Sequence, residues 1–275
     1  FDRGDAAPAW TGFDRYVQGQ APAITWVGHS TVLLELDGVR LLTDPVLRER
    51  MIHLRRVSGS ADVHALHDVD ALLISHLHYD HLDVKSLRVV GRASRVVVPV
   101  GAGDMLRSRG FAHVTELEVG DDTDVNGVNV SATHAEHGGR QVFRMRVPAL
   151  GYLVSGSVRI WFAGDTDLFD GMSHVARDLD VALLPVAGWG PRVPRGHLNP
   201  ERAAQALTLL HPRIAVPIHW GTYRRVGLPS GEDVLREPAE SFARIAAEVA
   251  PDVDVRILPV GGRLELSGVH EGVAT

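Results

Sequence analysis

The stretch "ISHLHYDHLD", residues 74–83, places three histidines and two aspartates within ten positions at the end of the apolar run "ALLI". Neutral imidazoles and carboxylates are ligands of zinc and related cations. Because a strand presents alternate side chains to one side, His76 and His78 at the end of a buried strand can bind one cation. Asp80 and His81 follow the turn and can face a second cation. This spacing favours a metal site over a set of solvated loop histidines.

Further ligands must come from other parts of the chain, because one loop cannot complete two metal sites. Three other apolar runs end in suitable residues, in "ATHAEHGGR", "WFAGDTD" and "VPIHWGTY". They offer His134 or His137, Asp165 and His219. Taken singly, each is equally consistent with a turn aspartate or a half-buried histidine. The sequence has no cysteine, so any metal must be held by His, Asp or Glu.

The elements that must position these residues are short apolar runs separated by turn residues, a pattern typical of buried strands. Asn199 followed by Pro200 is a common helix start. We expect an α/β layered domain with mixed sheets, read as a single domain over residues 1–275 with 1–22 as an N-terminal extension. Residues 45–68 and 186–197 are expected to be long connections. Helices are expected at about 83–91, 102–109, 172–178, 199–210 and 238–249.

Composition narrows the classes of partner. The formal net charge of −6 gives no basic footprint, so nucleic acid is not an expected partner. No apolar stretch approaches the roughly 20 residues of a membrane span, and no leader is visible, so we expect a cytoplasmic protein. A removed leader stays open because the chain begins at Phe1. Segment 45–57 mixes apolar residues with arginines, and we interpret it as a solvated loop; membrane contact is not expected.

The motifs "SHLHYDHLD", "GDT" and "PIHWGTY" together resemble the metallo-β-lactamase superfamily and match its HxHxDH motif. The stretches "TWVGHSTVLLELDGVRLLTDPVL", "GHLNPERAAQAL" and "IHWGTY" look more narrowly similar to the branch that contains N-acyl phosphatidylethanolamine-hydrolysing phospholipase D and ascorbate-6-phosphate lactonase. The resemblance covers about residues 24–265.

This resemblance implies a four-layer αββα sandwich with two Zn²⁺ at one edge of the sheets; Mn²⁺ or Fe²⁺ are alternatives. Asp165 would bridge the two metals. In "THAEH" the resemblance favours His137 as the ligand and leaves His134 as a rival. The metal ligands carried over in this way are His76, His78 and His137 for the first ion and Asp80, His81 and His219 for the second.

Other residues are expected near the site. The resemblance implies that Asp44 in "LLTDP" orients a ligand imidazole, although an Asp-Pro turn is equally consistent. His29 is expected to have a structural hydrogen-bonding role. His197 is the expected substrate contact or proton donor, and Asp80, His197 and Asp44 form the catalytic set. Surface or packing roles are the commoner alternatives for the remaining candidates, which are Arg140, Arg195, Tyr79, Trp189, Trp220 and Tyr223.

The function expected from the residues and the resemblance is that of a binuclear zinc hydrolase. In this reading a metal-activated water attacks a phosphodiester, as in a phospholipase D, in a small substrate that is phosphorylated or lipid-like. The alternative on the same site is hydrolysis of a lactone or amide. A third reading is a metal-binding, non-catalytic regulatory protein. The motifs do not separate the first two, and the oligomeric state, including a homo-oligomer, is left open.

Overall fold

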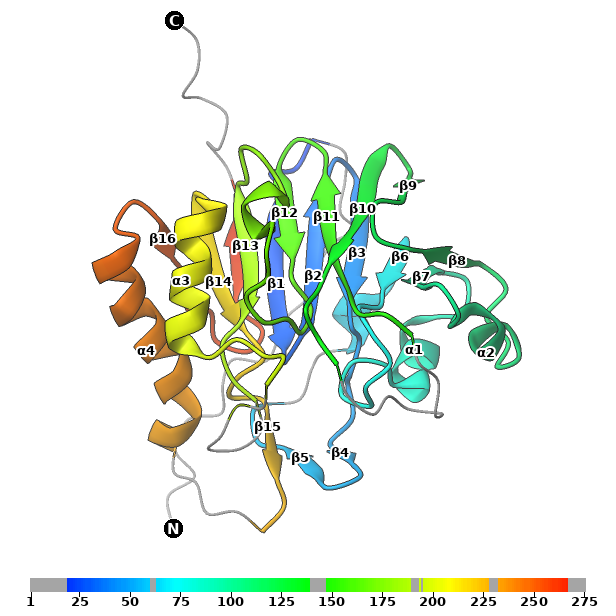
Figure 1. Cartoon of the computed structure of the whole chain (residues 1–275). Coiled ribbons are helices and arrows are strands. Elements are labelled where there is room, and N and C mark those ends of the chain that lie inside the picture. Colours follow the sequence, from blue (N-terminus) through cyan, green and yellow to red (C-terminus); the bar gives the residue numbers. More distant parts are fainter. Residues whose placement is uncertain are drawn as a thin grey trace, which may run out of the picture.

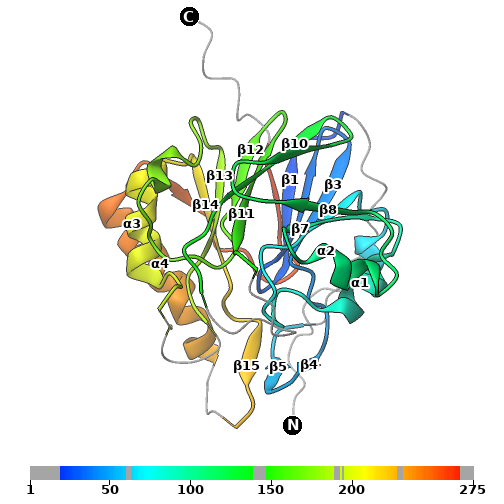
Figure 2. The same ribbon diagram turned by 45° about the vertical axis from the view of Figure 1, so that its right-hand side comes forward.

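The computed structural model describes residues 19–59, 63–138, 147–188, 193, 195–227 and 232–266. Two sheets lie face to face, and pairs of helices cover their outer faces (Figures 1 and 2). Helices α1 (Val84–Val90) and α2 (Gly103–Arg107) cover one sheet, and α3 (Pro200–Leu210) and α4 (Glu232–Val249) cover the other. The arrangement is the expected four-layer αββα sandwich, so the fold prediction is confirmed.

Each large sheet has seven strands and mixes parallel with antiparallel pairs. The first has the order β17 (Arg263–Glu265), β1 (Ala23–Gly28), β2 (Thr31–Leu36), β3 (Val39–Thr43), β6 (Ala71–Leu73), β7 (Arg95–Pro99) and β8 (Val114–Leu117). The second has the order β16 (Asp254–Val255), β14 (Ile214–Ile218), β13 (Val181–Pro185), β12 (Arg159–Phe162), β11 (Leu150–Ser155), β10 (Val128–His134) and β9 (Asp122–Val125).

The central strands are apolar along their whole length because both faces of each sheet are covered. In β2 every residue is buried. Val32, Leu34 and Leu36 point into the core between the two sheets, while Leu33 faces the core beneath α1 and α2. Strand periodicity of two therefore divides one apolar run between two cores.

The helices follow the sequence signals with three differences. Helix α3 begins as expected, since the Asn199 side chain accepts a hydrogen bond from Arg202 N at 2.9 Å and Pro200 occupies the first turn. Helix α4 begins at Glu232, earlier than expected, and contains Pro238 inside it. The helix expected at 172–178 is only a 3₁₀ turn over Met172–His174, and α2 is shorter than expected.

A third, small sheet lies within the segment expected to be a long connection. Its order is β15 (Tyr223–Arg225), β5 (Leu54–Arg56) and β4 (Arg50–Met51). Met51, Leu54 and Tyr223 pack with Val46 in a separate small core. The expectation of a solvated loop over 45–57 was therefore wrong. Strands β4 and β5 are too short for an alternating apolar pattern to be recognised in the sequence. The buried side chains of Met51 and Leu54 nevertheless pack the hairpin onto the domain. None of the described helices combines the length and apolar character needed to cross a bilayer.

Candidate metal centre

The residues expected to bind metal follow strands that end at the same edge of the sandwich. Strand β3 runs parallel to β6, and β12 runs parallel to β14, while β1 and β10 each share the direction of these strands through two antiparallel steps. The carboxyl ends of these strands therefore meet at one edge. Within three residues of these strand ends come His29, Asp44, His76, His137, Asp165 and His219.

Three histidines form the first cluster. The Nε2 atom of His76 lies 2.9 Å from Nδ1 of His78, and Nε2 of His137 lies 3.0 Å from the same atom. His76 is fully buried, whereas His78 and His137 are half-buried and give the cluster access to solvent. The sequence alternation at the end of β6 thus places His76 and His78 on one side, as expected from strand geometry.

The second cluster contains Asp80, His81 and His219 and also His29, with one ligand atom from each within 4.8 Å of the others. The Nε2 atom of His29 lies 3.1 Å from Oδ2 of Asp80, and its ring centroid lies 4.0 Å from that of His219. His29 therefore contacts an expected ligand, which sequence reasoning did not assign. Its position directly after β1, like that of His219 after β14, is the signal that identifies it.

Asp165 lies between the two clusters. Its Oδ2 atom is 3.1 Å from Nε2 of His81 and 4.0 Å from Nε2 of His76, and its Oδ1 atom is 3.3 Å from Nε2 of His219. Gly164 permits this approach, because it has a φ of +61° and an added Cβ would lie 2.8 Å from the Cβ of Ser75. The glycine in "AGD" is therefore required by the close contact between two strand ends.

The outward ring nitrogens of four histidines are already hydrogen-bonded. Nδ1 of His137 donates to the Gly196 carbonyl at 2.8 Å, and Nδ1 of His219 donates to the Ala187 carbonyl at 2.7 Å. Nδ1 of His81 lies 2.7 Å from Oδ2 of Asp44, and Nδ1 of His76 lies 2.9 Å from the Ser75 hydroxyl. In the unprotonated ring, such a partner at Nδ1 leaves the lone pair on Nε2, which is the nitrogen that faces the cluster.

Asp44 is the buried group that connects two of these histidines. Its carboxylate accepts hydrogen bonds from Ser75 N at 2.7 Å and from the Ser75 hydroxyl at 2.5 Å, in addition to its contact with His81. Burial raises the pKa of Asp44, while His81 and Ser75 act in the opposite direction. Asp44 therefore lies against Nδ1 of His81, and its carboxylate is also close enough to His76 and His81 for the three to form a metal-capable group.

Burial and neighbouring charges shift the pKa values of several residues in the two clusters. Burial and the neighbouring His81 lower the pKa of His76 well below its usual value, and burial with His137 lowers the pKa of His78 to about 4. Burial opposes a charged His81, but Asp165 and Asp80 outweigh it and raise the pKa of His81 well above its usual value. Burial also opposes ionisation of Asp165, which His219 and His81 overcome, so its pKa lies well below the usual range.

The donor set suits a divalent cation. Unprotonated imidazole nitrogens and carboxylates are the ligands that zinc and similar metals take in the absence of cysteine. The Oδ1 atom of Asp165 is buried and has no hydrogen-bond partner among the described residues. A buried carboxylate oxygen without a partner is costly, and a cation between the clusters would satisfy it. The residues present therefore suit a metal site.

The structure separates the two rival histidines in "THAEH". His134 is exposed, and its Nε2 atom lies 3.4 Å from Glu136 on the surface, whereas His137 lies in the first cluster. His197 lies beside the clusters, with Nε2 3.3 Å from Oδ2 of Asp165 and its ring centroid 4.6 Å from that of His137. Burial opposes protonation of His197, but the hydrogen bond and charge of Asp165 raise its pKa.

The other predicted residues lie around the site or support it. Trp220 is buried and stacks on Trp26 at 4.8 Å between centroids, which is a packing role. Tyr223 is buried and makes an edge contact with His29 at 5.4 Å, while the Tyr79 hydroxyl lies 2.9 Å from Nε2 of His53. Arg195 is exposed. Arg140 and Trp189 lie outside the described residues.

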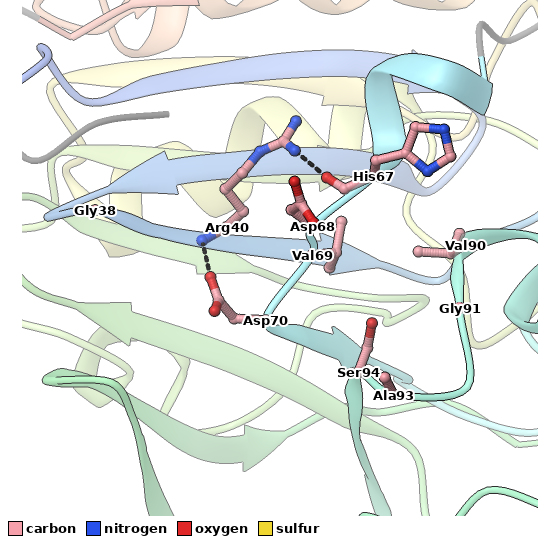
Figure 3. A pocket seen from close by; sticks show the side chains of 10 residues that line it. All are labelled: Gly38, Arg40, His67, Asp68, Val69, Asp70, Val90, Gly91, Ala93 and Ser94. Atoms are coloured by element: carbon pink, nitrogen blue, oxygen red, sulfur yellow. Dashed lines mark hydrogen bonds between the residues drawn. The ribbon is translucent and has the colours of Figure 1, made fainter. Parts of the chain in front are cut away.

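A hollow of about 960 Å³ lies at the opposite edge of the first sheet, at the amino ends of its strands (Figure 3). Residues at the amino ends of strands line it, among them Gly38 before β3, Asp70 before β6 and Ser94 before β7. No residue of the two histidine clusters lines it. Its volume therefore does not mark the chemistry of this protein, which the convergent ligand atoms mark instead.

Comparison with known proteins identifies the family. The family described as "Beta-lactamase superfamily domain" matches residues 39–220. An uncharacterized protein of Mycobacterium tuberculosis is 35% identical over 258 residues, covering 87% of this chain and 69% of the relative. A UPF0173 metal-dependent hydrolase of Methanopyrus kandleri is 30% identical over 250 residues, covering 88% of this chain and 99% of the relative.

Two further similarities bear on the branch and the fold. The N-acyl-phosphatidylethanolamine-hydrolyzing phospholipase D 1 of Caenorhabditis elegans is 30% identical over 226 residues, covering 72% of this chain and 64% of that protein. Among solved structures, a metallo hydrolase of Ignicoccus hospitalis has a TM-score of 0.65 at 22% identity, covering 89% of this chain and 98% of the other. The chain belongs to the metallo-β-lactamase superfamily, as the HxHxDH motif indicated.

Proposed function

We propose that this protein is a metal-dependent hydrolase with two Zn²⁺ ions held on either side of Asp165. The observation that carries the proposal is the meeting of two sets of histidine and aspartate donors at one strand-end edge, with the buried Asp165 carboxylate lying between them. We assign His76, His78 and His137 to the first ion and Asp80, His81 and His219 to the second. The family membership supports the same chemistry, since a relative of this chain is described as a metal-dependent hydrolase.

Two cations held in this way supply a water of lowered pKa and polarise the electrophilic oxygen of the substrate. The residues of the chain orient the metal ligands and protonate the leaving group. Asp44 fixes the ring of His81 through the 2.7 Å contact with Nδ1. His197 holds a proton on Nε2 beside Asp165 and is half-buried, so a leaving group can reach it. We propose that His197 donates this proton to the departing oxygen.

A phosphodiester of a small, lipid-like substrate is the proposed target. The support is the similarity to a protein described as N-acyl-phosphatidylethanolamine-hydrolyzing phospholipase D 1. A site that activates water needs no serine or cysteine nucleophile, which agrees with the absence of cysteine from the chain. A lactone or amide carbonyl is the competing target for the same water, and the substrate assay below separates the two.

The first test is the metal content per chain, measured by plasma mass spectrometry on wild-type protein and three variants. We expect about two equivalents in wild type, as in two-metal hydrolases, and loss of metal in His76→Ala and His137→Ala. His134→Ala is the matched control and should keep its metal, because His134 is exposed outside the clusters. Wild-type protein that stays metal-free after reloading would overturn the proposal.

The second test is turnover by zinc-loaded protein. Hydrolysis of bis(p-nitrophenyl) phosphate and glycerophosphodiesters, abolished in His76→Ala, would support the phosphodiester assignment. Turnover restricted to a panel of acyl homoserine and sugar lactones would replace it with the lactone assignment. Bound metal without any rate above that of metal-free solution would leave a non-catalytic metal-binding protein.

A further inference from the structure

The outer face of the small three-stranded sheet presents arginines in register. Arg50 on β4 lies opposite Arg55 on β5, and Arg55 lies opposite Arg224 on β15. Residues directly opposite on neighbouring strands project to the same face. The alternate residues Met51 and Leu54 are buried against the domain, so the arginine row faces outward. We refer to Arg50, Arg55 and Arg224 as the arginine row.

A hollow of about 500 Å³ lies along this row. It is lined by Arg50, Arg55, Arg56, Val57, Arg224, Arg225, Val226 and Gly227, with no acidic side chain among them. Arg50 and Arg55 form no ion pair with any residue that the structure describes. Like charges directly opposite one another on neighbouring strands are destabilising. The whole chain carries a net charge of −6, so this cluster of positive charge contrasts with the rest of the protein.

The floor of the hollow is fixed to the body of the domain by Arg56. This side chain is 3% exposed, and its guanidinium donates hydrogen bonds to the carbonyls of Gly59 and Val27 and to the Tyr223 hydroxyl. The backbone N–H of Val57 donates to the Thr222 carbonyl at 2.9 Å, which joins the hairpin to the segment after β14. The arginine row is therefore held on a preformed surface.

Exposed apolar side chains flank the row. Ile52 at the tip of the β4–β5 hairpin is 83% exposed and has a φ of 42°, and Val226 is 60% exposed. Val226 N donates to the His53 carbonyl at 2.8 Å, so these two apolar residues belong to adjacent backbone segments. A β-branched residue in the left-handed region is an uncommon and strained choice at a solvent-facing turn. The strain suggests that Ile52 is retained for a contact.

We propose that the arginine-lined hollow is a binding site for a phosphate group. Guanidinium groups pair with phosphate oxygens through parallel hydrogen bonds, and a dianion would relieve the repulsion between Arg50 and Arg55. The ligand is a phosphate ester, carried either by a soluble organophosphate or by a lipid headgroup. None of the lining residues belongs to the histidine clusters, so this site does not depend on the proposed hydrolase function.

The test is calorimetric titration of inorganic phosphate into the metal-loaded full chain. Replacing two members of the row, in Arg50→Gln/Arg55→Gln, should weaken phosphate binding by roughly tenfold or more, because charge-assisted hydrogen bonds are lost. The matched control, Arg236→Gln/Arg244→Gln on α4, removes the same charge from an exposed helix face and should bind phosphate as wild type does. Unchanged unfolding midpoints would establish that both variants are folded.

Phosphate could also bind at the metal centre, and a further variant separates the two sites. In His76→Ala protein, phosphate binding by the arginine row should persist and should still be lost on adding Arg50→Gln/Arg55→Gln. Equal phosphate affinity of the wild-type and row variants in both backgrounds would overturn the proposal. This result would be independent of whether the protein hydrolyses a phosphodiester.

The source of the phosphate group is tested with vesicles of phosphatidylcholine, with and without phosphatidylglycerol. Cosedimentation that requires phosphatidylglycerol and is lost in both the row variant and Ile52→Ser would support the site and assign it to lipid headgroups. Binding of inorganic phosphate without cosedimentation would support the site and assign it to a soluble organophosphate. Cosedimentation that the row variant retains would count against the arginine row.

Discussion

The two opposite ends of the sandwich handle polar groups in opposite ways. At the carboxyl ends of the strands, histidine nitrogens and carboxylate oxygens converge, and the Asp165 Oδ1 atom has no hydrogen-bond partner among the described residues. At the amino ends lies the hollow shown in Figure 3, where the buried charge is matched. The Arg40 guanidinium donates to the carbonyls of His67 and Ala65 and to the Glu35 carboxylate.

The two regions differ in whether their buried polar groups need a ligand. A buried polar group without a partner costs free energy, so a set of such groups persists only where a ligand completes it. The amino-end edge needs no ligand, since Asp70 accepts hydrogen bonds from Arg40 N and from the Asn126 side chain. Converging ligand atoms are therefore a better marker of function in this protein than the volume of a hollow.

The largest difference between the edges should appear when one carboxylate is neutralised at each. We expect Asp165→Asn to lower the rate of hydrolysis by roughly a thousandfold, because it removes a group at the reacting centre. Asp70→Asn should leave the rate per folded molecule within about twofold, as expected for a group that only stabilises the fold. Steady-state rates and metal content of both purified variants check this. Comparable losses of rate in the two would remove the functional distinction between the edges.

The second prediction reverses the comparison and concerns stability. Arg40→Ala should lower the free energy of unfolding by about 3 kcal/mol, because it leaves buried carbonyls and one oxygen of the buried Glu35 without their donor. The metal content should be unchanged. Urea unfolding of wild type and variant, with metal analysis of the folded protein, provides the measurement. A stable Arg40→Ala protein that had lost metal would place Arg40 in the functional site.

A smaller effect is expected behind the ligands. Asp44→Asn should weaken binding of the second metal ion roughly ten- to a hundredfold, the usual range for a group that orients a ligand histidine. The reason is the loss of a charged acceptor at Nδ1 of His81. Asp180→Asn is a matched control, since this buried carboxylate accepts from Arg159 N at the start of β12, away from the clusters. Competition with a chelator of known affinity measures both, and equal metal affinities would contradict the role of Asp44.

The sequence predicted much of the fold because each apolar run carries its own strand signal and both faces of the sheets are covered. Asn199 and Pro200 located the start of α3 correctly. Helix α4 was expected only from about residue 238, whereas it begins at Glu232 and continues through Pro238. That continuation depends on the tertiary contacts of Ala239, Phe242 and Ala246 in the core, which no local pattern contains.

The candidate site could be predicted from the sequence because its residues lie near strand ends in motifs of fixed spacing. The HxHxDH stretch alone predicted two clusters, and the structure brings His137, Asp165 and His219 to them. His29 was underestimated, since its contact with Asp80 depends on a turn at φ 55° and on the packing of β1 against the segment after β14. The small sheet and its arginine row were missed for a related reason, because the register between β5 and β15 joins residues more than 160 positions apart.

The smallest effect that distinguishes the two edges is the pH dependence of stability in metal-free protein. Burial lowers the pKa of His29 to about 3 and that of His78 to about 4, and it also lowers the pKa values of His76 and His137. Below about pH 6.5 the unfolded chain takes up protons on these four histidines that the folded chain does not, so stability should fall as the pH drops from 6.5 towards 4.

Two histidines of the same edge act in the opposite direction, because Asp165 raises the pKa values of His81 and His197 and their protonated forms are favoured in the folded state. Four histidine pKa values are lowered and two are raised, so the free energy of unfolding should still increase as the pH rises. Urea midpoints at pH 7 and pH 5 measure this slope. His78→Ala should make this slope shallower, because it removes one of the histidines whose pKa burial lowers. A midpoint that did not move between the two pH values in wild type would mean that the buried histidines open to solvent without metal, and that the cluster is assembled by the cation rather than by the fold.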